Sequence, residues 1–123
     1  MVDDHALSGL RILVVEDEAV IAWALAESLR DLGCDVVGPA FNTMEAMEFS
    51  REPALSGAVL DVNLGRDKVF PVADALEERH IPFCFITGYD PAGLRPKDLR
   101  QPILQKPVDP EDIAQIAQNW RVH

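Results

Sequence analysis

The alternation of short apolar runs with segments of helical periodicity is the feature that most constrains how this chain can fold. The run at residues 10–15 combines leucine with β-branched side chains and stops abruptly at Glu16 and Asp17. Runs that are apolar on both faces are typical of central strands in a parallel sheet. Comparable runs predict four more strands, at residues 35–38, 58–62, 83–86 and 102–105.

Helices are predicted between and after these strands. The first helix ends at Gly33, and the second begins at a capping box of Asn42 and Glu45 and runs to about residue 51. The third helix has Pro71 in its first turn, and the last helix is capped by Asp109. The apolar stripe of the first helix is predicted to comprise Val20, Ile21, Ala24, Leu25, Ser28, Leu29 and Leu32.

This alternation predicts an α/β fold in which helices cover both faces of a doubly wound, five-stranded parallel sheet. Right-handed crossovers favour the flavodoxin-like strand order 2-1-3-4-5. The fourth crossover is unusual because residues 88–102 contain helix-breaking Pro91, Gly93, Pro96 and Pro102. We therefore expect a weak or short fourth helix.

Length and charge limit the function classes. The 123 residues suit one domain spanning 1–123, with a core at about residues 10–120. A net charge of −10 argues against nucleic-acid binding, and no apolar run approaches the ~20 residues of a membrane span. Cys34 and Cys84 have apolar neighbours, so we predict buried thiols and a reducing, cytoplasmic location.

Three carboxylates are predicted to meet at one edge of the sheet. Ligands of doubly wound sheets bind beyond the carboxyl ends of the strands where the strand order reverses. Here the reversal lies between the strands that end in Glu16, Asp17 and Asp61. Like charges ~4 Å apart repel by about 1 kcal/mol even in water, so this cluster requires a cation. Carboxylate oxygens that leave room for water and phosphate favour Mg²⁺.

Thr87 and Lys106 follow the fourth and fifth predicted strands and add a hydroxyl and an ammonium to the same edge. Asp61 can attack phosphorus and hold it as an acyl phosphate. The metal and Lys106 can neutralise the charge on the transferring oxygens. Each feature alone is more often structural, since acidic residues after a strand commonly cap the next helix. Together they predict a phosphoryl-transfer site.

Four motifs lie at these strand ends: ILVVEDE at residues 12–18, LDVNL at 60–64, Thr87–Gly88 and Lys106–Pro107. Through these motifs the chain resembles the receiver domains of two-component response regulators. The resemblance covers essentially the whole chain. The resemblance implies that Asp61 is the phosphoryl acceptor, Thr87 the switch hydroxyl and Lys106 the partner of the phosphoryl group. It implies that Mg²⁺ is bound by Glu16, Asp17, Asp61 and the backbone carbonyl of Asn63, and that the Lys106–Pro107 bond is cis. Glu16 replaces the more usual Asp, a mild departure.

Ile103 is a larger departure, because most receivers carry Tyr or Phe at this position as an aromatic switch. The segment PFCFITGY at residues 82–89 is similar to the FAT-GUY subgroup of receivers, in which the fourth helix also tends to be weak. We hypothesise that Tyr89, or the segment 89–101, replaces the missing switch.

The resemblance implies a signalling protein rather than an enzyme. Asp61 would receive its phosphoryl group from a phosphohistidine on a sensor histidine kinase or a histidine phosphotransfer domain, and a downstream protein would read the change. Trp23, on the first helix, is a candidate anchor for the donor. Partial burial of Trp23 beneath long side chains is the alternative.

Three other functions remain open from the sequence. A receiver-like interaction module would not depend on phosphorylation. A haloacid-dehalogenase-type phosphatase normally has a longer chain and a second Asp two residues after the nucleophile, where Asn63 stands. A flavodoxin-like cofactor binder would require a loop rich in glycine and hydroxyl residues after the first strand, and no such loop follows residues 10–15.

Overall fold

The computed structural model describes residues 5–88 and 93–121, and its main sheet consists of five parallel strands. These strands are β1 (Arg11–Val15), β2 (Asp35–Ala40), β3 (Gly57–Asp61), β6 (Phe83–Thr87) and β7 (Ile103–Gln105). Their order, β2-β1-β3-β6-β7, is the predicted 2-1-3-4-5 when the main sheet is numbered alone. The predicted flavodoxin-like fold is therefore confirmed.

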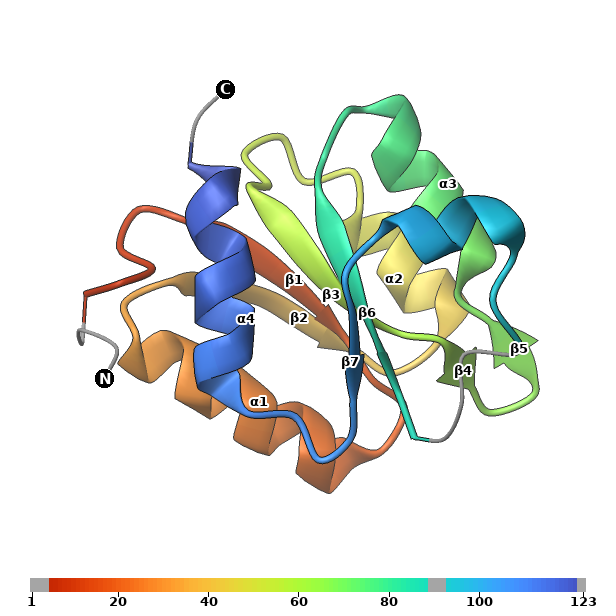
Figure 1. The fold of residues 1–123 in the computed structure, drawn as a ribbon, viewed down its shortest axis with the longest axis horizontal. Coiled ribbons are helices and arrows are strands. Elements are labelled where there is room, and N and C mark those ends of the chain that lie inside the picture. Colours follow the sequence, from red (N-terminus) through yellow and green to blue (C-terminus); the bar gives the residue numbers. More distant parts are fainter. Residues whose placement is uncertain (1–4, 89–92, 122–123) are drawn as a thin grey trace.

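Helices cover both faces of this sheet (Figure 1). On one face lie α1 (Ala19–Asp31) and α4 (Pro110–Ala117), which a short 3₁₀ helix, η3 (Gln118–Trp120), extends. On the other face lie α2 (Thr43–Phe49) and α3 (Phe70–Glu78). Within the two described ranges, no helix has the length and apolar character needed to span a bilayer.

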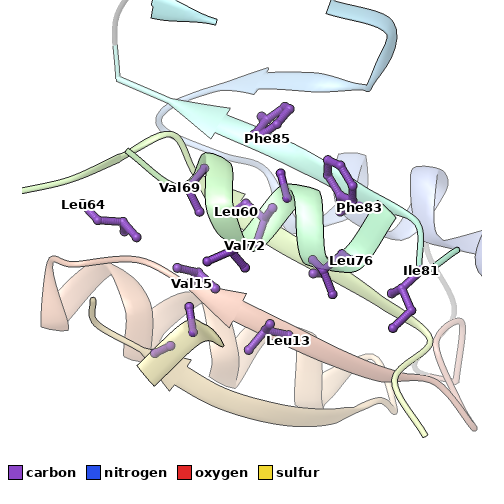
Figure 2. Packing of buried hydrophobic residues seen from close by; sticks show 14 of the residues in the cluster. Leu13, Val15, Leu60, Leu64, Val69, Val72, Leu76, Ile81, Phe83 and Phe85 are labelled. Carbon is purple, nitrogen blue, oxygen red and sulfur yellow. The ribbon is translucent and has the colours of Figure 1, made fainter. Parts of the chain in front are cut away.

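Successive residues of β1 enter two separate cores, because side chains alternate between the faces of a strand. Ile12 and Val14 pack in the cluster that includes α1 and α4, whereas Leu13 and Val15 pack in the cluster under α2 and α3. Figure 2 shows the second cluster, in which Leu13 and Val15 lie with side chains from β3, α3 and β6. Burial on both faces explains why residues 12–15 of this strand are all apolar.

The apolar stripe of α1 was predicted correctly at Leu25 and Leu29 and wrongly at other positions. The buried side chains are Ala22, Leu25, Ala26 and Leu29. Val20 is 82% exposed, and Ala24 is also exposed. Apolar residues occur around most of this helix, and the sheet packs against the side that carries two small alanines. The periodicity alone therefore could not identify the buried side.

The fourth crossover contains a short 3₁₀ helix, η2 (Pro96–Arg100), where a doubly wound fold usually has an α-helix. This agrees with the predicted weak fourth helix. The Arg95 guanidinium holds η2 against α3: it pairs with Asp74 at 2.9 Å and Asp98 at 2.7 Å, and it lies 4.5 Å from the ring centre of Phe70. We call these four residues the Arg95 clasp. Tyr89 lies outside the described residues.

A two-stranded antiparallel hairpin of β4 (Asn63–Leu64) and β5 (Asp67–Lys68) follows β3 and was not predicted. Its turn requires glycine at residue 65, where φ is 66°. The hairpin lies beside the carboxyl end of β3, where it borders the site described below.

Both cysteines are buried free thiols, as predicted. Burial raises the pKa of Cys34 to about 11 and that of Cys84 to about 12. Neither sulfur is therefore a reactive thiolate near neutral pH.

Candidate functional site

Adjacent ends of β1 and β3 bring carboxylates together. The two strands pair in parallel with Val15 opposite Leu60, so Glu16 and Asp61 emerge side by side. One carboxylate oxygen each of Glu16, Asp17 and Asp61 lies within 4.8 Å of the other two. Glu16 and Asp61 are buried, and Asp17 lies nearer to solvent. The sheet thus places three acidic groups in one cluster, two of them shielded from water.

Lys106 supplies a cation to this cluster. It follows β7, and its Nζ lies 2.6 Å from Oε1 of Glu16 and 3.0 Å from Oδ2 of Asp61. The backbone N–H of Lys106 donates to the carbonyl of Thr87 at 2.8 Å, which fixes this residue beside the end of β6. One ammonium therefore pairs with two of the three carboxylates of the cluster. The peptide bond between Lys106 and Pro107 is cis, as the resemblance implied.

The two buried carboxylates differ in proton affinity. Burial raises the pKa of Asp61 to about 7, the neighbouring Glu16 acts in the same direction, and the hydrogen bond from Lys106 opposes them. Burial also favours the protonated form of Glu16, but hydrogen bonds with Lys106, Asp61 and the Glu18 N–H hold its pKa below the ordinary value. Asp61 is therefore the buried carboxyl group of the pair whose pKa is raised.

The hairpin forms one rim of the site through backbone donors. The N–H of Gly65 donates to Oδ2 of Asp17 at 3.0 Å, and the N–H of Asn63 donates to Oδ1 of Asp61 at 3.2 Å. The side chain of Lys68 donates to Oδ1 of Asn63. These contacts orient two of the three carboxylates from a single local element.

A cavity of about 210 Å³ opens above the acidic cluster and is lined by Asp17, Glu18, Asp61, Asn63, Gly65, Gly88 and Lys106. Asp61 and Lys106 both line it, so a small anionic group in the cavity would lie next to this ion pair. Thr87 is buried at the end of β6 and, like Glu16, is not among the lining residues. The predicted site residues thus lie at one edge of the sheet. Thr87 and Glu16 are buried there and do not line the cavity.

Sequence reasoning missed the hairpin and Lys68. The available signal was Gly65 between two short segments, Asn63–Leu64 and Asp67–Lys68, which is the spacing of a two-residue hairpin. The segments are too short and too polar for strand periodicity to reveal them.

Comparison with known proteins places the chain among regulators. No family model matches it. The phyllosphere-induced regulator PhyR of Methylorubrum extorquens is 32% identical over 111 residues, which cover 85% of this chain and 41% of PhyR. The chain spans less than half the length of the curated relatives it matches.

Solved structures match over nearly the full chain. SdrG from Sphingomonas melonis is 37% identical with a TM-score of 0.77, and the match covers 93% of this chain and 98% of SdrG. The receiver domain of the Pseudomonas aeruginosa sensor histidine kinase PA1611, which has magnesium in its active-site cleft, is 22% identical with a TM-score of 0.77 over 92% of this chain and 98% of that domain. Other structures of this fold are response-regulator receivers.

Proposed function

This chain belongs to the receiver domains of response regulators, and from that premise we propose that it accepts a phosphoryl group on Asp61 and signals through the resulting change. The observation that carries the proposal is the meeting of Asp61, two further carboxylates and Lys106 at one cavity. The matched relatives are regulators, in agreement with a signalling protein rather than an enzyme.

The donor set suits a Mg²⁺ ion. Carboxylates of Glu16, Asp17 and Asp61, with the backbone carbonyl of Asn63, would hold it through oxygen atoms, the ligands that Mg²⁺ prefers. Three carboxylates against the single ammonium of Lys106 leave excess negative charge, which a divalent cation would offset. When bound, Mg²⁺ would neutralise charge on the transferring phosphoryl oxygens. The magnesium-containing receiver of PA1611 supports this assignment by analogy of fold.

Asp61 would act as the nucleophile. A carboxylate oxygen of Asp61 forms the new bond to phosphorus, the bond from phosphorus to the donor's imidazole nitrogen breaks, and the imidazole leaves with the electron pair. Lys106, 3.0 Å from Oδ2 of Asp61, offsets the negative charge that arrives with the phosphoryl group. The Asn63 N–H keeps the carboxylate oriented during this step.

Thr87 would convert phosphorylation into a conformational change. Its hydroxyl would donate to a phosphoryl oxygen and draw the end of β6 toward Asp61. Such a contact favours one of two arrangements of the chain that follows β6, by no more than the free energy of the new interaction. Membership of the FAT-GUY subgroup, with Tyr89 or the 89–101 segment in place of an aromatic switch at residue 103, remains part of this proposal.

The donor would be a phosphohistidine on a sensor histidine kinase or a histidine phosphotransfer domain. An apolar groove of about 340 Å³ lies between α1 and the segment after β7, and Lys106 lines both this groove and the acidic cavity. A helix of the donor lying in the groove would bring its histidine to Asp61. Buried free thiols favour the reducing cytoplasm as the place of this exchange.

Incubation with acetyl phosphate and Mg²⁺, followed by intact-protein mass spectrometry, tests the proposal. Wild type and Asp67→Asn, an exposed hairpin control, should each gain one phosphoryl group, while Asp61→Asn should gain none. Equal uptake by Asp61→Asn would refute Asp61 as the acceptor. No uptake by wild type would favour a phosphorylation-independent module, and turnover of many phosphate esters would favour a hydrolase.

A further inference from the structure

Lys68 lies on the β4–β5 hairpin that borders the acidic cavity, and it has no role in the proposed phosphoryl transfer. It pairs with Asn63 across the β4–β5 hairpin, and its Nζ donates a hydrogen bond to Oδ1 of Asn63. Asn63 in turn lines the cavity and donates its backbone N–H to Oδ1 of Asp61 at 3.2 Å. Lys68 thus acts directly on the side chain two residues after the proposed phosphoryl acceptor.

The hydrogen bond from Lys68 determines whether the oxygen or the NH₂ group of the Asn63 carboxamide is available to a group in the cavity. An ammonium carries only donors, so it pairs with the amide oxygen and not with the amide NH₂ group. Because Asn63 lines the cavity, its NH₂ group is the end of the carboxamide that remains available to a group bound there. Without the ammonium, the terminal torsion of Asn is broad, and the amide oxygen could occupy this position as well.

Lys68 is exposed to solvent, and its own hairpin and one neighbouring segment limit where its ammonium lies. The hairpin is anchored to the acidic cluster because the N–H of Gly65 donates to Asp17 at 3.0 Å. On the other side, a Cβ placed on Gly93 would lie 3.7 Å from Nζ of Lys68, an ordinary contact distance. Nζ therefore lies between the Asn63 carboxamide and the chain that precedes η2.

We propose that Lys68 is a positioning residue that prolongs the lifetime of phosphorylated Asp61, an inference that rests on the proposed function. In hydrolysis, a water oxygen bonds to phosphorus and the bond from phosphorus to the Asp61 oxygen breaks. The Asp61 carboxylate leaves with the electron pair, and the water protons pass to the released phosphate and bulk solvent. An Asn63 NH₂ group donates to phosphoryl oxygens, whereas an Asn63 oxygen would accept a hydrogen bond from the attacking water and orient it. By holding the oxygen away, Lys68 slows the loss of phosphate.

The lifetime of the phosphorylated protein provides the test. Protein phosphorylated with acetyl phosphate and Mg²⁺ is freed of the donor by rapid desalting, and the remaining phosphoprotein is followed over time. Lys68→Ala should lose phosphate roughly two- to tenfold faster than wild type, the range expected for one positioned hydrogen bond. Its rate of phosphorylation should be unchanged, and Lys68→Arg should restore a near-wild-type lifetime.

Two controls separate positioning from general charge. Arg66→Ala removes the same charge from the same hairpin and should leave the lifetime unchanged. In an Asn63→Ala background, Lys68→Ala should have no further effect, because its target is already absent. The inference is refuted if Lys68→Ala decays like wild type, if Arg66→Ala accelerates decay equally, or if the effect persists without the Asn63 side chain. If wild type accepts no phosphoryl group at all, the proposed function itself fails.

Discussion

Asp61 and Glu16 show how neighbouring atoms give two similar carboxyl groups different roles. Burial, with the proximity of Glu16, raises the pKa of Asp61 to about 7, while Lys106, Asp61 and the Glu18 N–H keep the pKa of Glu16 low despite its burial. Asp61 is therefore the group whose protonation changes near neutral pH. Because a nucleophile and a metal ligand must both be ionised, this group sets the pH range in which the site can work.

We predict that Mg²⁺ binding weakens as the pH falls through about 7. The raised pKa means that protonated Asp61 dominates below that pH, so the proton competes with the metal for the carboxylate. Above that pH, the affinity should reach a plateau. Isothermal titration calorimetry over a pH series measures this dependence, and Asp61→Asn should show a weaker, flatter response. An affinity that increases on acidification would contradict the prediction.

At the scale of elements, the Arg95 clasp explains how η2 stays in place without the contact area of a full helix. Its guanidinium bonds in bidentate fashion to Asp74 of α3, and its Nε reaches Asp98, which is only 2% exposed. Hydrogen bonding to Arg95 lowers the pKa of Asp74. A planar guanidinium satisfies both carboxylates at once and lies over the Phe70 ring, a geometry that lysine cannot reproduce.

Replacement of Arg95 by alanine should lower the free energy of unfolding by about 1–3 kcal/mol, mainly because the buried Asp98 carboxylate loses its charged partner. Lys97→Ala is the matched control, since Lys97 also pairs with Asp74 but is exposed to solvent. Urea unfolding followed by circular dichroism measures both variants. Equal losses for the two variants would show that the clasp has no special role.

Trp23 on α1 is exposed to solvent on one side and contacts another aromatic ring. It is 53% exposed, and its ring lies 6.2 Å from that of Phe41 in a tilted arrangement. Trp23→Ala should slow phosphoryl transfer from a phosphohistidine donor roughly tenfold, as expected for an interface anchor, without changing phosphorylation by acetyl phosphate. Leu99→Ala, at a similarly exposed residue on η2, should leave both rates unchanged. Slowing with both donors would instead indicate damage to the site.

Across the whole molecule, the proposed acceptor and η2 are connected by the chain that follows β6. β6 pairs with β3 beside Asp61 and with β7 on its other edge. A displacement at Thr87 would therefore also displace the start of the β6–β7 crossover. In the described part of this crossover, residues 93–101, Leu94 is the apolar side chain that packs against a core cluster, so a shift of this segment exposes little apolar surface.

Hydrogen exchange tests this coupling. Beryllofluoride with Mg²⁺, a mimic of the phosphoryl group, should slow amide exchange in residues 93–101 more than in α4. The reason is that the new contact with Thr87 favours one arrangement of the crossover. Asp61→Asn should abolish the effect. Exchange in this segment that does not respond to the mimic would count against the proposed switch.

The sequence determined the sheet order and the chemistry of its edge. Two-faced apolar runs can only be buried in the middle of a layered α/β fold, and the carboxyl ends of parallel strands lie at one edge, so Glu16, Asp17 and Asp61 had to converge. The prolines of the fourth crossover likewise excluded a long helix there. These outcomes follow from local composition and from topology, both of which can be read along the chain.

Only the tertiary structure decided which side of α1 is buried and how the β4–β5 hairpin borders the cavity. It also decided which side chains Arg95 and Lys68 contact. Apolar residues occur on several sides of α1, so the choice depended on the shape of the sheet it packs against. The contacts of Lys68 with Asn63 and of Arg95 with Asp74 depend on long side chains, whose directions are set by neighbouring elements. The two buried carboxylates separate in pKa for the same reason: burial and charge are properties of the assembled site, not of either residue alone.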